Sequence, residues 1–185
     1  MRFRRDPTKI RGSIAPVISP FSADGAPDLD SLRALVRWQL DSGSHGISLG
    51  GSTGEPSAQS TAERASAIRA AADEIADRVP FVPGTGSAKL DETLELTAIA
   101  QAAGADAVLI ITPYYARPTQ EGLFHWYSTV AAEFPDLPLT EPGQARALAL
   151  LREGAGVLEG PVAKVARSRQ PWSSGAEKRI VQNDE

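Results

Sequence analysis

Residues Gly50-Gly51-Ser52-Thr53-Gly54-Glu55 form a glycine-rich turn with two hydroxyls, directly after a short apolar run at 45–49. Backbone N–H groups in such a turn can converge on an anion, and glycines let the chain approach it closely. About sixty residues later, Thr112-Pro113-Tyr114-Tyr115 ends a second apolar run at 107–111. Polar clusters at the ends of two strands of a βα repeat are what an active site at one end of a barrel requires.

On either side of these stretches, apolar runs and helical patterns alternate along the chain. Strands are predicted at 12–18, 46–49, 79–82, 107–112 and 137–139. Helices are predicted between them: from the N-cap Asp28 to Gly43, from the capping box Ser60–Glu63 to about Ile75, at about 90–103 before Gly104, and from the cap Thr119 to about Phe134. The alternation indicates parallel strands joined by right-handed crossovers, at about 31 residues per unit.

Doubly wound sheets and barrels share this pattern. The first strand is not followed by a Gly-x-Gly-x-x-Gly motif, which argues mildly against a Rossmann fold. A (β/α)8 barrel requires about 250 residues, whereas 45 residues follow Thr140. We therefore expect an α/β fold, a partial (β/α)8 barrel of about five βα units over residues 1–140. Residues 141–185 are expected to form a divergent tail, partly helical and disordered at its end.

The composition is that of ordinary globular protein, with 42% hydrophobic and 23% charged residues and a net charge of −4. That charge favours neither nucleic acid nor an anionic membrane surface. Cysteine is absent, which excludes disulfides and thiol catalysis, and the two histidines lack metal-ligand spacing. No apolar run approaches the ~20 residues of a membrane span, and the basic N-terminus has no apolar stretch behind it. We expect a cytoplasmic protein without a metal.

Each motif also has a purely structural interpretation. Taken alone, residues 50–55 are better explained by a tight βα turn in which Ser52 and Thr53 cap backbone groups. The functional alternative is a pocket for the carboxylate of a small 2-oxo acid, with Glu55 bracing the turn.

The tyrosine pair is explained either by core aromatics that seal the rim or by a phenol that donates protons beside a hydroxyl network. For Gly84-Thr85-Gly86 an ordinary turn is favoured over a backbone that must stay clear of a ligand. His125 is expected on an outer helix face.

Lysines are few, which matters if the chemistry uses a Schiff base. They are Lys9, Lys89, Lys164 and Lys178. Lys164 lies in the apolar stretch 162–166, a setting that can lower the pKa of an amine and make it a nucleophile.

Taken together, residues 10–139 resemble the dihydrodipicolinate synthase / N-acetylneuraminate lyase family of class I aldolases. The matching stretches are Gly12-Ser13-Ile14-Ala15-Pro16-Val17 with Pro20-Phe21, Gly51-Ser52-Thr53-Gly54-Glu55, Gly84-Thr85-Gly86, and Thr112-Pro113-Tyr114-Tyr115 through Pro118-Thr119-Gln120-Glu121-Gly122-Leu123. Each motif alone is weak, but their order and spacing together are specific.

The resemblance implies a homotetrameric barrel that binds pyruvate as a lysine Schiff base and needs no other cofactor. Ser52 matches the hydroxyl of the family's proton relay, and Thr53 matches the residue that holds the pyruvate carboxylate. Tyr115 matches the relay tyrosine that crosses the dimer interface. In the synthases the enamine condenses with an aldehyde, aspartate semialdehyde, in lysine biosynthesis. Relatives cleave sialic acid or process other sugar acids.

The resemblance stops at the fifth strand. The family continues into a Tyr-Asn-x-Pro-Gly-Arg-like motif and a lysine in a Gly-x-Lys setting, whereas this chain reads Thr140-Glu141-Pro142-Gly143-Gln144. Lys164 lacks that setting. We therefore expect an impaired lyase, through a frame shift, a deletion or a misjoined gene. The alternatives are another 2-oxo-acid lyase of the family, a non-catalytic remnant that binds small carboxylates or other subunits, and a chain with no stable fold.

Overall fold

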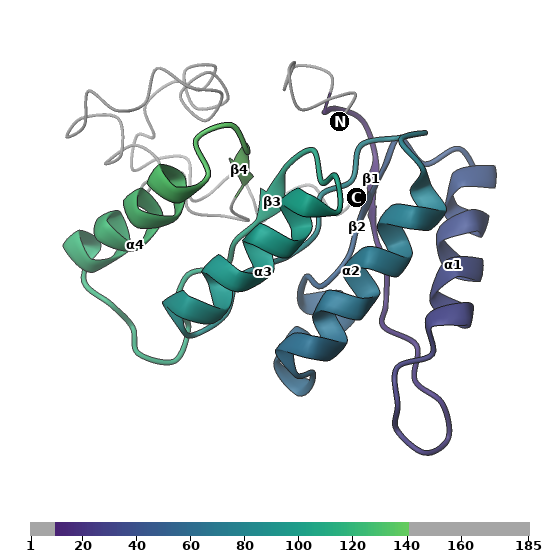
Figure 1. Ribbon diagram of the computed structural model, residues 1–185, viewed down its shortest axis with the longest axis horizontal. Helices are drawn as coiled ribbons and strands as arrows, with labels where there is room; N and C mark the ends of the chain where they lie inside the picture. The colour runs from purple at the N-terminus through teal and green to yellow at the C-terminus, as the bar shows by residue number, and fades with distance from the viewer. Residues whose placement is uncertain (1–9, 141–185) are drawn as a thin grey trace, which may run out of the picture.

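The computed structural model describes residues 10–140, in which strands and helices alternate along the chain (Figure 1). The strands are β1 (Ile14–Pro16), β2 (Gly46–Ser48), β3 (Val108–Leu109) and β4 (Leu139–Thr140). The α-helices are α1 (Leu29–Asp41), α2 (Thr61–Ile75), α3 (Leu90–Ala102) and α4 (Gln120–Glu133). Two short 3-10 helices, η2 (Ser52–Gly54) and η3 (Pro56–Ala58), lie between β2 and α2.

The strands pair in parallel and in chain order. β1 pairs with β2, and β3 pairs with β4. The segment 80–85 joins the two pairs through parallel bridges between Ile47 and Phe81 and between Gly84 and Leu109. Five extended segments therefore follow one another in the order in which they occur in the sequence.

The third extended segment does not form the continuous strand that the sequence predicts. We predicted a strand at 79–82, but the segment forms only isolated bridges. Pro80 and Pro83 have no N–H to donate. The N–H of Phe81 instead donates to the carboxylate of Asp106 at 3.0 Å. The other strands are also shorter than predicted, and Pro16 removes a donor from β1 in the same way.

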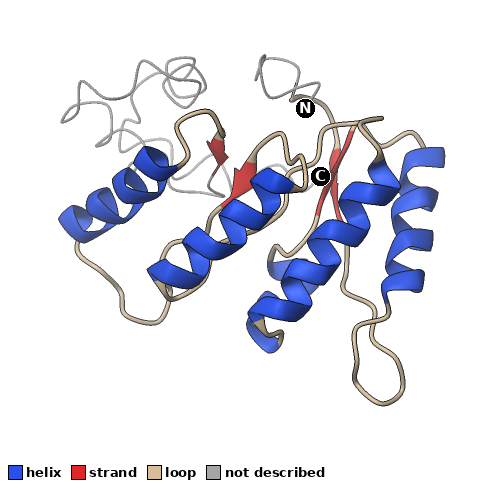
Figure 2. Cartoon of the chain, in the orientation of Figure 1, coloured by secondary structure: helices blue, strands red, loops and turns tan. Residues whose placement is uncertain are grey.

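The helices form one layer beside the strands, and Figure 2 shows them in front of the strands in that view. They pack in chain order: α1 on α2, α2 on α3, and α3 on α4. A doubly wound sheet places helices on both faces, so the arrangement of residues 10–140 does not match that alternative.

The predicted helix ends are confirmed. Asp28 accepts a hydrogen bond from the N–H of Ser31, and Thr119 accepts one from the N–H of Gly122. Ser60 and Glu63 form the complete capping box of α2. Gly43 and Gly104 follow α1 and α3 with φ of +85° and +90°, a conformation that favours glycine.

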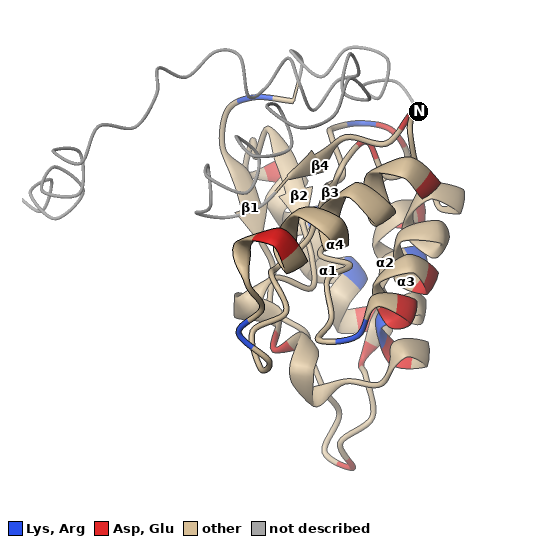
Figure 3. Cartoon of the chain, turned by 90° about the vertical axis from the view of Figure 1, so that its left-hand side faces the viewer, with Lys and Arg blue, Asp and Glu red and all other residues tan. Residues whose placement is uncertain are grey.

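The core lies between the helix layer and the strands. Its fully buried apolar side chains come from both layers and include Val36, Ile47, Leu96, Val108, Ile110 and Val130. The charged residues gather on helices and loops (Figure 3), and β1 to β4 contain none. None of the helices in residues 10–140 has the length and hydropathy of a membrane-spanning segment.

Candidate functional site

The turn after β2 exposes its hydroxyls and its backbone donors. Ser52 and Thr53 are exposed, and neither hydroxyl makes a hydrogen bond to another described residue. The N–H groups of Gly51, Ser52 and Thr53 likewise make no hydrogen bond within residues 10–140. The interpretation in which the hydroxyls cap the turn is therefore wrong for the described residues. Three N–H groups and two hydroxyls thus have no hydrogen-bond partner within residues 10–140, and such groups can bind an anion.

The position of this turn is set by side chains on either side of it. The carbonyl of Gly54 accepts hydrogen bonds from the Ser19 hydroxyl at 2.8 Å and from the Gln59 side-chain amide at 2.7 Å. Gln59 also donates to Ser19 at 2.9 Å. Glu55 adopts φ of +48°, and its exposed carboxylate makes no hydrogen bond or ion pair with the described residues. Ser19 and Gln59, and not the Glu55 carboxylate that we expected, brace the turn.

The Gly84-Thr85-Gly86 segment lies against both neighbouring strand ends. A Cβ at Gly84 would lie 2.3 Å from the carbonyl oxygen of Gly50, and one at Gly86 would lie 2.6 Å from the nitrogen of Ile111. The glycines therefore keep clear of adjacent backbone. Thr85 is fully buried, with its hydroxyl 2.9 Å from that of Thr97.

The tyrosine pair after β3 lies on the surface of the chain. Tyr114 is 52% exposed and Tyr115 is 89% exposed. The interpretation of these residues as core aromatics is therefore wrong. Tyr127 on α4 fills that role, since it is buried and its hydroxyl donates to the carbonyl of Ile110 at 3.1 Å. His125 lies on the outer face of α4 with its side chain 71% exposed, as predicted.

These motifs follow strand ends on the same edge of the strand layer. The segments that carry Ser52 and Thr53, the 84–86 segment, and the segment leading to Tyr115 each follow the carboxyl end of a parallel strand. No hydrogen bond among the described residues joins Tyr115 to Ser52 or Thr53. Lys164, the candidate nucleophile, lies outside the described residues.

Sequence reasoning missed Arg64 on α2. It is 7% exposed, and its guanidinium donates to the carbonyls of Gly84 and Gly86. A signal was available, because Arg64 shares a helical face with Ile68, Ala71 and Ile75, all buried. The hydrogen bonds of Ser19 and Gln59 to the carbonyl of Gly54 had no such signal in the sequence.

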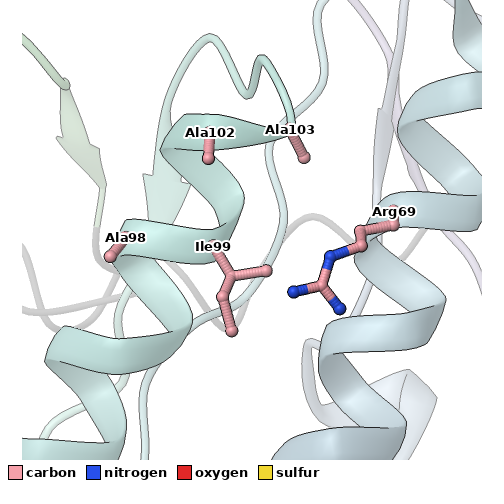
Figure 4. Close-up of a pocket in the computed structure, with 5 residues that line it drawn as sticks. All are labelled: Arg69, Ala98, Ile99, Ala102 and Ala103. Carbon is pink, nitrogen blue, oxygen red and sulfur yellow. The ribbon is translucent and has the colours of Figure 1, made fainter.

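A second feature of the surface lies away from these motifs. A hollow of about 390 Å³ separates α2 from α3 and is lined by Arg69 and by four apolar residues of α3 and its C-terminal end, Ala98, Ile99, Ala102 and Ala103 (Figure 4). The Arg69 guanidinium is its polar group, and its lining residues carry none of the hydroxyls found after β2. In residues 10–140, no group of three or more His, Asp or Glu side chains is placed to hold a metal ion.

A family profile described as the dihydrodipicolinate synthetase family matches residues 9–140. The chain belongs to the dihydrodipicolinate synthetase family. The match ends where the resemblance in sequence was predicted to end.

Two curated members of the dihydrodipicolinate synthetase family illustrate the similarity. The 4-hydroxy-tetrahydrodipicolinate synthase of Thermus thermophilus is 49% identical over 138 residues, which cover 73% of this chain and 46% of that protein. The synthase of Herminiimonas arsenicoxydans is 41% identical over 137 residues, covering 73% of this chain and 47% of the relative. The chain thus spans about half the length of the curated relatives it matches.

Solved structures are similar to about seven-tenths of this chain. The dihydrodipicolinate synthase of Acinetobacter baumannii, solved with pyruvate, is 40% identical with a TM-score of 0.68, covering 71% of this chain and 45% of that one. The N-acetylneuraminate lyase of Mycoplasma synoviae is 27% identical with a TM-score of 0.69, covering 72% and 46%.

Proposed function

We propose that this chain contains the pyruvate-binding half of a lyase of the 4-hydroxy-tetrahydrodipicolinate synthase type. The observation that supports it is the turn after β2, whose free N–H groups and hydroxyls match what a small carboxylate requires. Membership of the family and the pyruvate bound to the relative from Acinetobacter baumannii point to the same ligand.

In this proposal the residues have separate roles. Thr53 and the N–H groups of residues 51–53 hold the carboxylate of pyruvate. A lysine amine attacks the keto carbon, water leaves, and the iminium that forms withdraws electrons so that the methyl group loses a proton. The resulting enamine attacks an aldehyde such as aspartate semialdehyde. Ser52 and Tyr115 move the protons between these groups and water. Lys164 is the proposed nucleophile.

We propose a partial (β/α)8 barrel for the architecture. Parallel strands in chain order with the helices in a single layer support it, because a barrel has that order and that one-sided layer. The exposure of Tyr115 supports a homo-oligomer, a tetramer by family, in which the tyrosine reaches a second subunit. A cytoplasmic location completes this proposal.

Residues 141–185 bear on activity because they contain Lys164, the proposed nucleophile. The family match ends at residue 140, which supports a division into residues 1–140 and 141–185. The sequence around Lys164 does not match the family's lysine motif, so we propose that this chain binds pyruvate but turns over weakly or not at all.

A second candidate is another 2-oxo-acid lyase of the family, which the structural similarity to N-acetylneuraminate lyase supports. A third is a remnant that binds small carboxylates without catalysis. All three share the turn after β2.

The test treats the purified chain with pyruvate and borohydride, which reduces a Schiff base to a stable amine, and maps the adduct by mass spectrometry. A stoichiometric adduct at Lys164 would support a working lyase. No adduct, together with a rise in Tm on adding pyruvate, would support the binding remnant. No adduct and no rise in Tm would contradict the proposal.

A matched pair of variants tests whether the pyruvate-dependent rise in Tm depends on the turn after β2. Thr53→Val keeps the side-chain volume and removes one donor, and we expect it to abolish most of the pyruvate-dependent rise in Tm. Ser57→Ala, an exposed position in the neighbouring η3, should leave that rise unchanged.

A further inference from the structure

Arg64 is a buried cation without an acidic partner at ion-pair distance among the described residues. Its residue exposure is 7%, and it belongs to the buried face of α2. Burial lowers the pKa of its guanidinium, while electrostatic interactions with Glu92 and Tyr114 oppose that shift. A buried charge destabilises the fold unless hydrogen bonds compensate it. The hydrogen bonds of Arg64 should therefore show why a cation is placed here.

Those contacts are to backbone. One terminal nitrogen, Nη2, donates to the carbonyl of Gly84 at 3.2 Å and to that of Gly86 at 3.0 Å. The Nε atom is buried without a hydrogen-bond partner among the described residues. The guanidinium thus holds both ends of the Gly84-Thr85-Gly86 segment.

The 84–86 segment contacts both arms of the candidate site, which we define as the turn at 50–55 and the segment 109–115 that ends in Tyr115. On one side the N–H of Gly84 donates to the carbonyl of Leu49 at 2.6 Å, one residue before the turn that presents Ser52 and Thr53. On the other side the N–H of Thr85 donates to the carbonyl of Leu109 at 2.9 Å. The absence of a Cβ at Gly84 and Gly86 lets their backbone press against Gly50 and Ile111. A shift of this segment would therefore change the spacing of the two arms.

We propose that Arg64 is a positioning residue for the pyruvate site: by holding the carbonyls of Gly84 and Gly86, it sets the separation between the turn at 51–53 and the segment that presents Tyr115. Arg64 itself does not touch the substrate. This inference rests on the proposed function, since it assigns a support to the same site.

The experiment uses the full chain and two readouts, amide hydrogen exchange and the affinity for pyruvate. Arg64→Met keeps much of the volume but removes the donors. We expect exchange at residues 84–85 to rise at least about tenfold and the Kd for pyruvate to rise about tenfold, because two carbonyls lose their donor. Arg64→Lys retains the cation and one donor group, so it should recover part of both effects and guards against outright unfolding.

The control is Arg69→Met, on the same helix but exposed and without a hydrogen bond to a described residue. It should leave both readouts at the values of the unsubstituted chain. Unchanged exchange and Kd in Arg64→Met would overturn the inference. So would an equal rise in exchange in α1 and at 84–85, which would mark a general loss of stability. An unsubstituted chain that does not bind pyruvate would overturn the proposed function instead, and exchange would still decide whether Arg64 holds the segment.

Discussion

Gly84 is glycine because the neighbouring chain leaves no room for a side chain at that position. The position does not have a positive φ, so backbone conformation does not demand glycine there. The demand comes from the neighbouring chain, since a Cβ would lie 2.3 Å from the carbonyl oxygen of Gly50. The local pattern predicts an ordinary turn at 84–86, because it does not record contacts between residues more than thirty positions apart.

We predict that Gly84→Ala destabilises the chain by about 2 kcal/mol or more, because the added methyl meets backbone that cannot move independently. Urea or thermal unfolding followed by circular dichroism measures the change. Gly51→Ala is the matched control, since its Cβ would meet only a side-chain carbon of Leu109, at 3.6 Å. Equal stability of the two variants would show that the strand ends are free to separate.

At the scale of elements, α2 is determined locally at its start and by the fold along its length. The Ser60 hydroxyl accepts from the N–H of Glu63 at 3.3 Å, and the Glu63 carboxylate accepts from the N–H of Ser60 at 2.7 Å. These bonds use residues three apart, so the sequence predicted them correctly. The hydrogen bonds of Arg64 on the same helix depend on the 84–86 segment, which lies twenty or more residues further along the chain.

Removing the cap should therefore have a defined cost. We predict that Ser60→Ala destabilises the chain by about 1 kcal/mol, measured by urea unfolding, because the N–H of Glu63 loses its acceptor at the start of α2. Ser66→Ala, within the same helix, should be neutral or slightly stabilising, since alanine favours a helix interior. A cost for Ser66→Ala as large as for Ser60→Ala would contradict the capping argument.

The ion pairs between α1 and α2 should make stability depend on pH. Arg37 donates to both oxygens of Glu74, at 3.1 and 2.9 Å, and this lowers the pKa of Glu74 below its usual 4.5. A lowered pKa in the folded state means that Glu74 stabilises the fold above about pH 4.5, and that this contribution is lost as the pH falls through the folded-state pKa.

We predict that Glu74→Gln lowers Tm by about one to three degrees at neutral pH, since a surface pair contributes little. The difference from the unsubstituted chain should vanish as the pH falls below the folded-state pKa of Glu74. Glu95→Gln, at an exposed position of α3, controls for the change in net charge. A difference in Tm that persists at low pH would exclude the ion pair as its cause.

For the whole molecule, several large apolar side chains lie on the surface of the single chain. Among residues 10–140, those at least two-fifths exposed are Ile18, Phe21, Trp38, Ile111, Tyr114 and Tyr115. Contiguous exposed apolar surface often marks an interface. Ile111, Tyr114 and Tyr115 follow the same strand, so we expect self-association to involve that end of the strand layer.

We predict that Tyr115→Ser shifts the chain toward smaller species in analytical ultracentrifugation, because it removes the most exposed of these aromatic side chains. Trp38→Ser, on α1 and 60% exposed, is the matched control and should leave the distribution of species unchanged. If only Trp38→Ser dissociates the assembly, the interface lies on the helix layer instead.

The sequence by itself determined the order of strands and helices, the helix ends, and the family of the chain. These features depend on residues a few positions apart, such as Asp28 with Ser31 and Thr119 with Gly122, or on motifs whose order can be read directly. The tertiary structure decided which side chains support the site. Arg64, Ser19 and Gln59 hold backbone carbonyls of the site, and Ser19 and Arg64 reach theirs across twenty or more residues. Such bonds form only when crossover connections bring distant strand ends to one edge, and a local pattern does not record that proximity.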